Sequence, residues 1–205
     1  MTRLFANGSH FLLVIGLFAA LSVNATQADD DRPWPQYGGP NRDNISPDTG
    51  LMPTWPEGGP RLLWTAPNLG EGYSSVSLAD GKILTMGGIG DGEFIICLNE
   101  SDGSELWRVR NGSNRADGMG GGPRGTPTIV DDQSYALGAN GDMGCYELDS
   151  GDRVWGGNIL QTFNASNIGW GISESVLVDG DNVVFTPGGN QATMVCVDRN
   201  TEEIK

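Results

Sequence analysis

The feature that most constrains the fold of this chain is a segment that occurs three times. Each copy contains a cysteine and, two positions later, an acidic or amide residue; the first two copies end in a tryptophan ten positions after the cysteine. The cysteines are Cys97, Cys145 and Cys196, at intervals of 48 and 51 residues. A regular interval of roughly 20 to 50 residues indicates that one structural unit is repeated along the chain.

Each repeat has the pattern of four short strands. Around the cysteine, two apolar runs flank a polar turn such as Asp102-Gly103, which is typical of a β-hairpin. A second hairpin pattern lies upstream, as at Asp80-Gly81. Four antiparallel strands per repeat make one blade of a β-propeller. The sequence therefore predicts an all-β fold with blades at residues 74–110, 126–156 and 174–205.

The repeats resemble the blade signature of the PQQ-like (pyrroloquinoline-quinone repeat) β-propeller family, Ala-Leu-Asp-x-x-Thr-Gly-x-x-x-Trp, with cysteine in place of alanine. A segment near the start also resembles the leader of secreted bacterial members of this family: Trp34-Pro35-Gln36-Tyr37-Gly38-Gly39-Pro40. The resemblance covers about residues 34–205. It implies a fold and does not by itself imply an activity.

The length of the chain predicts a partial propeller. At about 48 residues per blade, a ring of seven or eight blades needs about 340 to 390 residues. About three blades are present, so the chain is interpreted as the N-terminal portion of a ring. Residues 61–66 end in the Leu-x-Trp pattern of an outer strand, and the resemblance implies that this strand closes the ring by pairing with the last blade.

The first 60 residues predict export. Residues 1–28 combine Arg3, an apolar run of about eleven residues and small residues at Ala25 and Ala28, which is the pattern of a secretory signal peptide. The apolar run is too short to span a membrane in the mature chain. Residues 29–60 predict an extended leader rich in proline and glycine. The first cysteine is Cys97, so a lipid anchor is not expected, and the predicted location is periplasmic or extracellular.

Charge excludes one class of partner, and the setting of the cysteines predicts their state. With 26 acidic and 12 basic residues the net charge is −14, and no basic cluster is present, so nucleic acid is excluded as a partner. An unidentified protein or cell-envelope component is the expected partner. The three cysteines lie among apolar residues and are expected to be buried, free thiols.

Candidate site residues are those expected at the rim of the central channel, where inner strands begin. Two repeat positions are predicted to converge there, and their members are Tyr73, Arg124 and Ile172, and Ser75, Thr126 and Glu174. Arg124 and Glu174 could hold a carbonyl-bearing or anionic ligand, or they could pair with each other as a structural tie, which is the favoured interpretation. Trp170, in the loop before the third blade, is a weaker rim candidate.

Several kinds of chemistry are not supported. The glycine-rich run at 118–123 precedes a strand rather than a helix, so it lacks the context of a phosphate-binding loop. The single histidine, His10, lies in the predicted signal peptide, which excludes a histidine-based zinc site or catalytic triad from the rest of the chain. No catalytic or metal-ligating residue is assigned.

The function predicted from these features is that of an exported, non-catalytic propeller repeat protein that acts as a scaffold or binding module without a cofactor. The alternative is that the chain is a fragment of a quinoprotein alcohol dehydrogenase. The resemblance implies that such an enzyme would carry PQQ and calcium and commonly a disulfide between adjacent cysteines. This sequence contains no adjacent cysteine pair.

Overall fold

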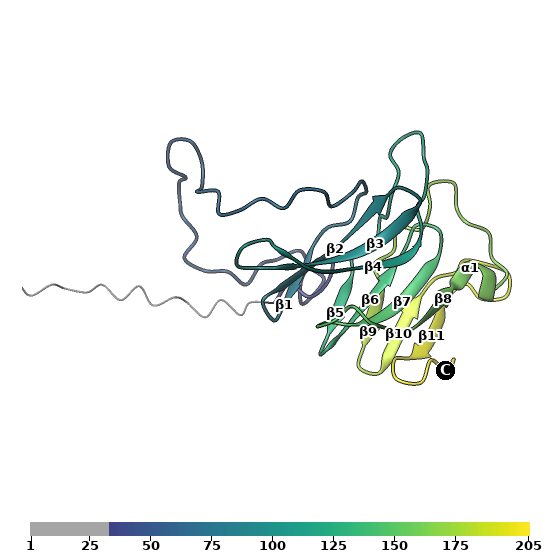
Figure 1. Cartoon of the computed structure of the whole chain (residues 1–205). Coiled ribbons are helices and arrows are strands. Elements are labelled where there is room, and N and C mark those ends of the chain that lie inside the picture. Colours follow the sequence, from purple (N-terminus) through teal and green to yellow (C-terminus); the bar gives the residue numbers. More distant parts are fainter. Residues whose placement is uncertain (1–32) are drawn as a thin grey trace, which may run out of the picture. The chain divides into compact units, whose positions relative to one another are not determined.

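The structure is a computed structural model that describes residues 33–205. The predicted signal peptide and the first residues of the leader lie outside the described residues. The described chain folds into three antiparallel sheets placed side by side, with one helical turn, α1 (Ile159–Thr162) (Figure 1). This arrangement confirms the predicted all-β fold of consecutive propeller blades.

The strands of each sheet are paired with their neighbours along the chain. The first blade contains β1 (Ser77–Ala79), β2 (Lys82–Ile89), β3 (Gly92–Asn99) and β4 (Glu105–Ser113). The second contains β5 (Thr128–Val130), β6 (Gln133–Leu137), β7 (Asp142–Glu147) and β8 (Arg153–Asn158). The third contains β9 (Leu177–Asp179), β10 (Asn182–Phe185) and β11 (Val195–Asp198). In the third blade the expected fourth strand is represented by a single bridge between Val197 and Ile204.

Short turns fix the register of the inner hairpins. Asp80 and Gly81 both have positive φ, 50° and 67°, which is the geometry of a type I′ turn. This turn places Ala79 opposite Lys82 and Leu78 opposite Ile83. Because side chains alternate between the two faces of a strand, a fixed register also fixes which residues enter which core.

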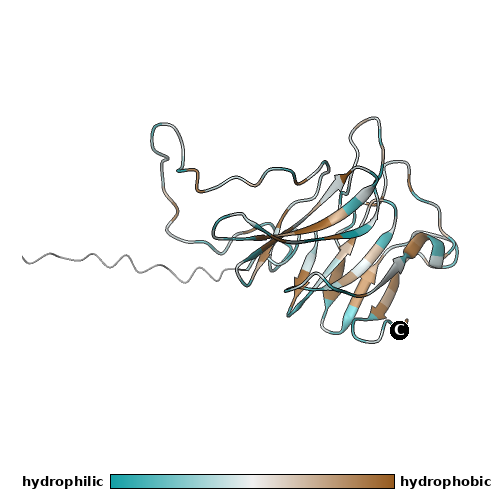
Figure 2. Ribbon diagram, in the orientation of Figure 1, coloured by the Kyte–Doolittle hydropathy of each residue, from teal (hydrophilic) through white to brown (hydrophobic). Residues whose placement is uncertain are grey.

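The second blade is buried on both of its faces. Tyr135 and Cys145 belong to a core shared with the third blade, whereas Ala136 and Tyr146, their sequence neighbours, belong to a core shared with the first blade. Figure 2 shows the hydrophobic residues concentrated on the strands. Successive side chains in these strands point to opposite faces of the sheet, so each strand contributes to two cores, one on each side.

A tryptophan links each blade to the next. The Nε1–H of Trp107 donates to the carbonyl oxygen of Leu148 at 3.0 Å, and that of Trp155 donates to Arg199 at 3.0 Å. Both acceptors lie three positions after the cysteine of the following blade. The ring of Trp107 also lies over Gly151, where a Cβ atom would approach it to 2.7 Å. The blade-end tryptophans thus pack against the following blade.

Trp64 makes the same contact although no blade precedes it among the described residues. Its Nε1–H donates to the carbonyl oxygen of Glu100 at 3.0 Å, and its ring lies over Gly103. Residues 61–66 form no strand in the structure. Trp64 nevertheless contacts the first blade in the way that Trp107, at the end of an outer strand, contacts the second. The pairing of this segment with a last blade stays a prediction.

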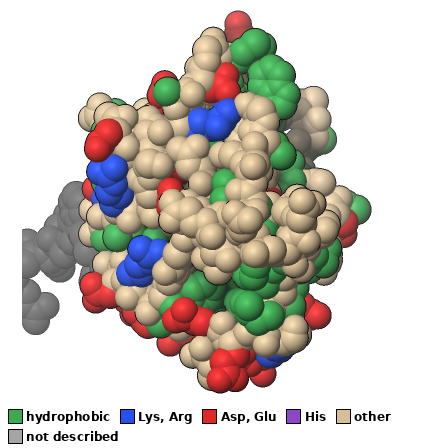
Figure 3. Space-filling view, turned by 90° about the vertical axis from the view of Figure 1, so that its right-hand side faces the viewer, with side chains coloured by type: hydrophobic (Ala, Val, Ile, Leu, Met, Phe, Trp, Pro, Cys, Tyr) green, Lys and Arg blue, Asp and Glu red, His purple; other side chains and the backbone are tan. Residues whose placement is uncertain are grey.

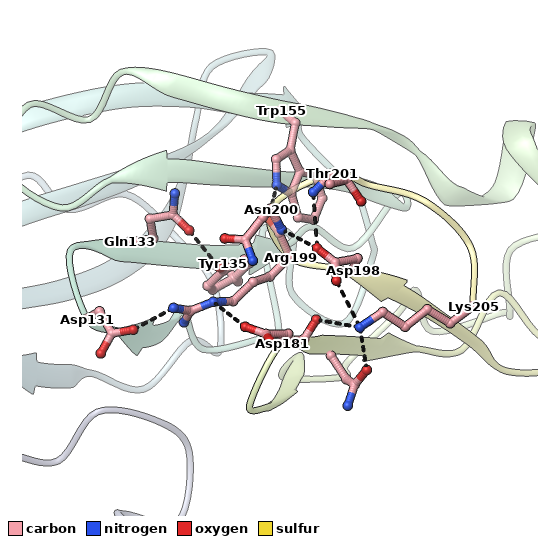
Figure 4. Close-up of polar contacts among 11 residues, drawn as sticks. Asp131, Gln133, Tyr135, Trp155, Asp181, Asp198, Arg199, Asn200, Thr201 and Lys205 are labelled. Atoms are coloured by element: carbon pink, nitrogen blue, oxygen red, sulfur yellow. Dashed lines mark hydrogen bonds and ion pairs between the residues drawn. The ribbon is translucent and has the colours of Figure 1, made fainter.

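Ion pairs reinforce the boundaries between blades. Arg199 of the third blade contacts Asp131 of the second, with 2.6 Å between Nη2 and Oδ2, and lies 3.8 Å from Asp181 (Figure 4). At the other boundary, the Nζ of Lys82 lies 2.8 Å from Asp149. Because the carboxylates are exposed, these pairs add little free energy and mainly set alignment.

The leader crosses the inner strands of all three blades. Trp34 exchanges two backbone hydrogen bonds of 2.9 Å with Leu78, and the carbonyl oxygen of Pro35 accepts from the N–H of Ile129 at 2.7 Å. Arg42 then donates through Nη2 to the carbonyl oxygen of Val176 at 2.7 Å. We call residues 34–42 the strap. This part of the predicted leader is ordered because it satisfies backbone groups on the edges of inner strands.

One face carries an exposed hydrophobic area. Figure 3 views the side on which α1 and the end of β11 lie, and its lower half shows hydrophobic side chains bordered by acidic ones. Ile204 is among the exposed apolar residues beside this edge, and a cavity of about 210 Å³ lies there, lined by Trp155, Phe163 and Phe185 among others. None of the helices in the described part of the chain has the length and hydrophobicity needed to cross a membrane.

The tryptophan contacts generate a stability prediction. Trp107→Ala should lower the free energy of unfolding by about 2 to 4 kcal/mol, because it removes a half-buried ring and leaves the carbonyl of Leu148 without its donor. Trp107→Phe, which keeps a ring, should cost about half as much. The control is Trp55→Ala in the exposed part of the leader, expected to change stability by less than about 0.5 kcal/mol. Urea unfolding followed by circular dichroism measures all three.

The cysteines generate a second prediction. Cys97, Cys145 and Cys196 are free thiols on β3, β7 and β11, and the first two are buried as the sequence predicted, whereas Cys196 is only partly buried. Burial raises the pKa of Cys97 and of Cys145 to about 12. N-ethylmaleimide should therefore modify the half-buried Cys196 first, and the other two only after unfolding. Mass spectrometry of digested protein gives the order, and early labelling of Cys97 would contradict the placement of β3 in the core.

Candidate functional site at the rim of the inner strands

The segments that lead into the inner strands are joined by hydrogen bonds from backbone N–H groups to side-chain hydroxyls of the next blade. The N–H of Ser75 donates to Oγ1 of Thr126 at 3.0 Å, and the N–H of Thr126 donates to Oγ of Ser175 at 2.9 Å. These three residues occupy one repeat position, so the rim position two residues earlier is occupied by Tyr73, Arg124 and Ser173. The sequence-based alignment was correct for the first two blades. In the third blade the alignment was one residue early. It placed Ile172 and Glu174 at the two positions that Ser173 and Ser175 occupy.

The shift of one residue changes the direction of Glu174. Its Oε2 accepts from the N–H of Thr186 at 3.0 Å and from the hydroxyl of the same residue. Ser74 makes the matching contact in the first blade, where its Oγ accepts from the N–H of Met86 at 3.1 Å. Side chains alternate along an extended segment, so Glu174 contacts its own β10 end and does not share the rim position of Arg124.

Arg124 is held within its own loop. Its guanidinium donates to the carbonyl oxygens of Gly122 at 2.6 Å and Gly120 at 3.0 Å, and lies 3.7 Å from Asp117. The side chain is only 10% exposed and lies over the ring of Tyr73, 5.4 Å from its centroid. The predicted Arg124–Glu174 tie is therefore wrong. The glycine-rich run serves instead to bring backbone carbonyls to this arginine.

A second arginine joins the two loops at the rim. Arg115 contacts Asp117 at 3.4 Å and donates to the carbonyl oxygen of Gly169, immediately before Trp170. Asp117 accepts from the N–H of Met119, which together with Arg115 and Arg124 lowers the pKa of its carboxyl group. The inter-blade loops are thus fixed to each other, and Trp170 is presented from a constrained backbone.

These loops line an open pocket at the start of the inner strands. The pocket has a volume of about 390 Å³ and is lined by Tyr73, Met119, Arg124, Trp170 and Ser173. We call it the axial pocket. Tyr73, Met119 and Trp170 are 59%, 74% and 64% exposed, so three large side chains present their surfaces to solvent. Trp170, a weak candidate in the sequence, is in this pocket together with Arg124.

A second groove of about 350 Å³ adjoins the axial pocket. Ser173 lines both, and the second groove continues along the residues Ser166, Ile168, Glu174, Thr186 and Thr193. We call the two together the rim groove. The strap contacts the inner strands closer to their hairpin turns, so the rim groove lies toward the opposite end.

The residues of the axial pocket do not fit a calcium-bound quinone. Calcium takes six to eight oxygen ligands, usually including carboxylates. Asp117 is held by two arginines, and Glu174, which has one oxygen bonded to Thr186, is the one carboxylate among the residues that line the rim groove, which is too few for calcium. Within residues 33–205, no group of three or more His, Cys, Asp or Glu side chains is arranged to hold a metal ion.

A buried carboxyl group lies behind the rim, between the first two blades. Glu93 on β3 is 1% exposed, and its Oε2 accepts from the N–H of Ala139 at 3.0 Å. Its Oε1 has no hydrogen-bond partner among the described residues. Loss of solvation is the largest cause that raises its pKa to about 7. This burial was not evident from the sequence, because an acidic residue at the start of an apolar run is also typical of an exposed strand end.

Comparison with known proteins identifies a family and a fold. The sequence model of the family described as outer membrane protein assembly factor BamB matches residues 56–205. No curated protein matches the chain significantly. Among solved structures, quinohemoprotein alcohol dehydrogenase from Comamonas testosteroni is similar over 85% of this chain and 26% of its own, with a TM-score of 0.55 and 15% identity.

Two further structures are similar. The quinohemoprotein alcohol dehydrogenase of Pseudomonas putida HK5 matches 70% of this chain and 22% of its own, at a TM-score of 0.51 and 16% identity. BamB from Moraxella catarrhalis matches 69% of this chain and 50% of its own, at a TM-score of 0.41 and 13% identity. The chain spans about a quarter of the length of the two dehydrogenases. At these identities the likeness to them concerns the propeller fold alone.

Glu93 generates a prediction about pH. Its pKa is raised in the folded chain, so the folded state binds the proton more tightly than the unfolded state, whose pKa is about 4.5. The contribution of Glu93 to stability is therefore complete below pH 4.5 and is lost as the pH rises to about 7.

Glu93→Gln removes this dependence. Compared with the variant, the wild-type chain should lose about 3 kcal/mol of unfolding free energy between pH 4.5 and pH 8. The variant should consequently be at least as stable as the wild type above pH 7. Parallel stability curves for the two proteins across this range would contradict a buried carboxyl at position 93.

Proposed function

Because the chain belongs to the PQQ-like repeat family described as outer membrane protein assembly factor BamB, we propose that it is an exported, non-catalytic propeller protein that acts as a scaffold or binding module. The observation that carries this proposal is that neighbouring groups occupy the guanidinium of Arg124. It is the one charged residue among those that line the axial pocket, and its guanidinium is taken up by two carbonyls, Asp117 and the ring of Tyr73. The pocket offers surfaces for recognition rather than a reactive group.

The thiols of the central strands fit the same proposal. Cys97 and Cys145 are buried in the cores between blades, and their raised pKa, about 12 in each case, keeps them protonated at neutral pH. The thiolate is the nucleophilic form of cysteine. These residues therefore serve as small apolar side chains in packing.

Export and location are part of the proposal. The pattern of residues 1–28 supports secretion, and the family description refers to the outer membrane. We place the mature protein in the periplasm or outside the cell. Its partner is a protein or a component of the cell envelope, bound through the rim loops and the exposed apolar residues of the blades.

The alternative is a fragment of a PQQ- and calcium-dependent quinoprotein alcohol dehydrogenase. The observation that favours it is Trp170, an exposed aromatic ring in the axial pocket on which a planar quinone could stack. In such an enzyme the quinone accepts the electrons from the alcohol. No carboxylate is among the residues that line the axial pocket, and Asp117 beside it is held by two arginines, so we assign no residue to this chemistry.

Titration with PQQ and calcium chloride tests the proposal. We expect no saturable change in the quinone absorbance or in tryptophan fluorescence up to a 100-fold molar excess, and no oxidation of ethanol with an artificial electron acceptor. Trp170→Ala is the matched variant. Saturable binding that this variant abolishes, accompanied by alcohol oxidation, would replace the proposed function with the enzymatic alternative.

A further inference from the structure

The rim groove has the composition of a carbohydrate site, and we propose that it binds a neutral glycan chain. This inference rests on the proposed function as a binding module and names its ligand. The axial pocket supplies exposed aromatic surface, and the adjoining groove supplies hydroxyl and carboxylate oxygens. The two share the lining residue Ser173, so a ligand that occupies both is an oligosaccharide rather than a single sugar.

The aromatic part of the argument concerns Trp170 and Tyr73. Both rings are more than half exposed, although burial of such rings is favourable. The C–H bonds on one face of a pyranose ring carry partial positive charge and pack against the negative face of an aromatic ring. A sugar therefore covers these surfaces without having to be apolar itself.

The polar part of the argument concerns the second groove. Its walls include the hydroxyls of Ser166, Ser173, Thr186 and Thr193. Glu174 Oε2 is occupied by Thr186, whereas Oε1 accepts no hydrogen bond from the residues that the structure describes. Hydroxyl groups both donate and accept, and a carboxylate accepts. This set matches a ligand whose own polar groups are hydroxyls.

Charge selects a neutral ligand. Arg124 is shielded by Asp117 and by backbone carbonyls, so it offers little attraction to an anion. Arg42 interacts electrostatically with Glu174 and so adds no free positive charge to the groove, and the net charge of −14 opposes anionic ligands. Acidic polysaccharides and nucleotides are thereby disfavoured.

The groove is also preorganised. Arg115 ties the loop that carries Met119 to the loop that carries Trp170, and Tyr73 donates its hydroxyl to the carbonyl oxygen of Met119 at 2.8 Å. Fixed loops reduce the entropy that a ligand must offset when it binds. This favours recognition of a flexible glycan, which itself loses freedom on binding.

Isothermal titration calorimetry with neutral hexasaccharides tests the inference. Cellohexaose, maltohexaose, mannohexaose and chitohexaose are each titrated into the full chain, and we expect saturable binding of at least one. Trp170→Ala should weaken that binding at least tenfold, and Glu174→Gln by a smaller factor. Trp55→Ala, which removes an exposed tryptophan of the leader, is the matched control and should leave the affinity unchanged.

Each outcome decides the inference. No saturable binding of any hexasaccharide at millimolar concentration overturns it, and so does binding that Trp170→Ala leaves intact while circular dichroism shows a folded variant. A lysine- and leucine-rich dodecapeptide is titrated in parallel. Binding of this peptide alone, lost in Trp170→Ala, replaces the glycan with a protein partner and leaves the binding-module function standing, whereas quinone binding with turnover removes that function.

Discussion

The structure depends on the burial of sheet faces between neighbouring blades. A four-stranded sheet has two faces, and in a repeat protein each unit covers the face that the next one exposes. The second blade meets this requirement fully, because Tyr135 and Ala136 enter different cores. The indole of each blade-end tryptophan then bonds a carbonyl of the following blade, which fixes how far one sheet is rotated against the next.

The candidate site is a product of the same stacking. The inner strands converge because the sheets are packed face to face. The hydrogen bonds from Ser75 to Thr126 and from Thr126 to Ser175 hold their starting segments together. The loops that return from one blade to the next must then pass above this point. Two arginines bind these loops together from within, so the side chains that remain exposed at the rim are mostly aromatic, apolar or hydroxyl-bearing.

The sequence predicted the repeated part of the molecule well and the connecting part less well. Strands, hairpins and the burial of Cys97 and Cys145 follow from local patterns that recur at a fixed interval, so each copy supports the others. The rim depends on loops of unequal length, and one residue of difference before β9 moved Glu174 away from the position predicted for it. Asp117 and Arg115 were missed because their partners are loop carbonyls and each other, which leave no periodic signal. Glu93 was missed because its burial comes from a different blade.

The strap has a consequence for how the chain acquires its structure over time. Arg42 and Val176 are 134 residues apart in sequence, whereas the hairpins pair within a few residues of each other. Closing so long a loop costs more entropy than closing a hairpin, so local pairs form first and distant contacts follow. During synthesis the leader emerges before the strands that it will cross. It must therefore wait, exposed, until the third blade has left the ribosome, and its docking is a late step of folding.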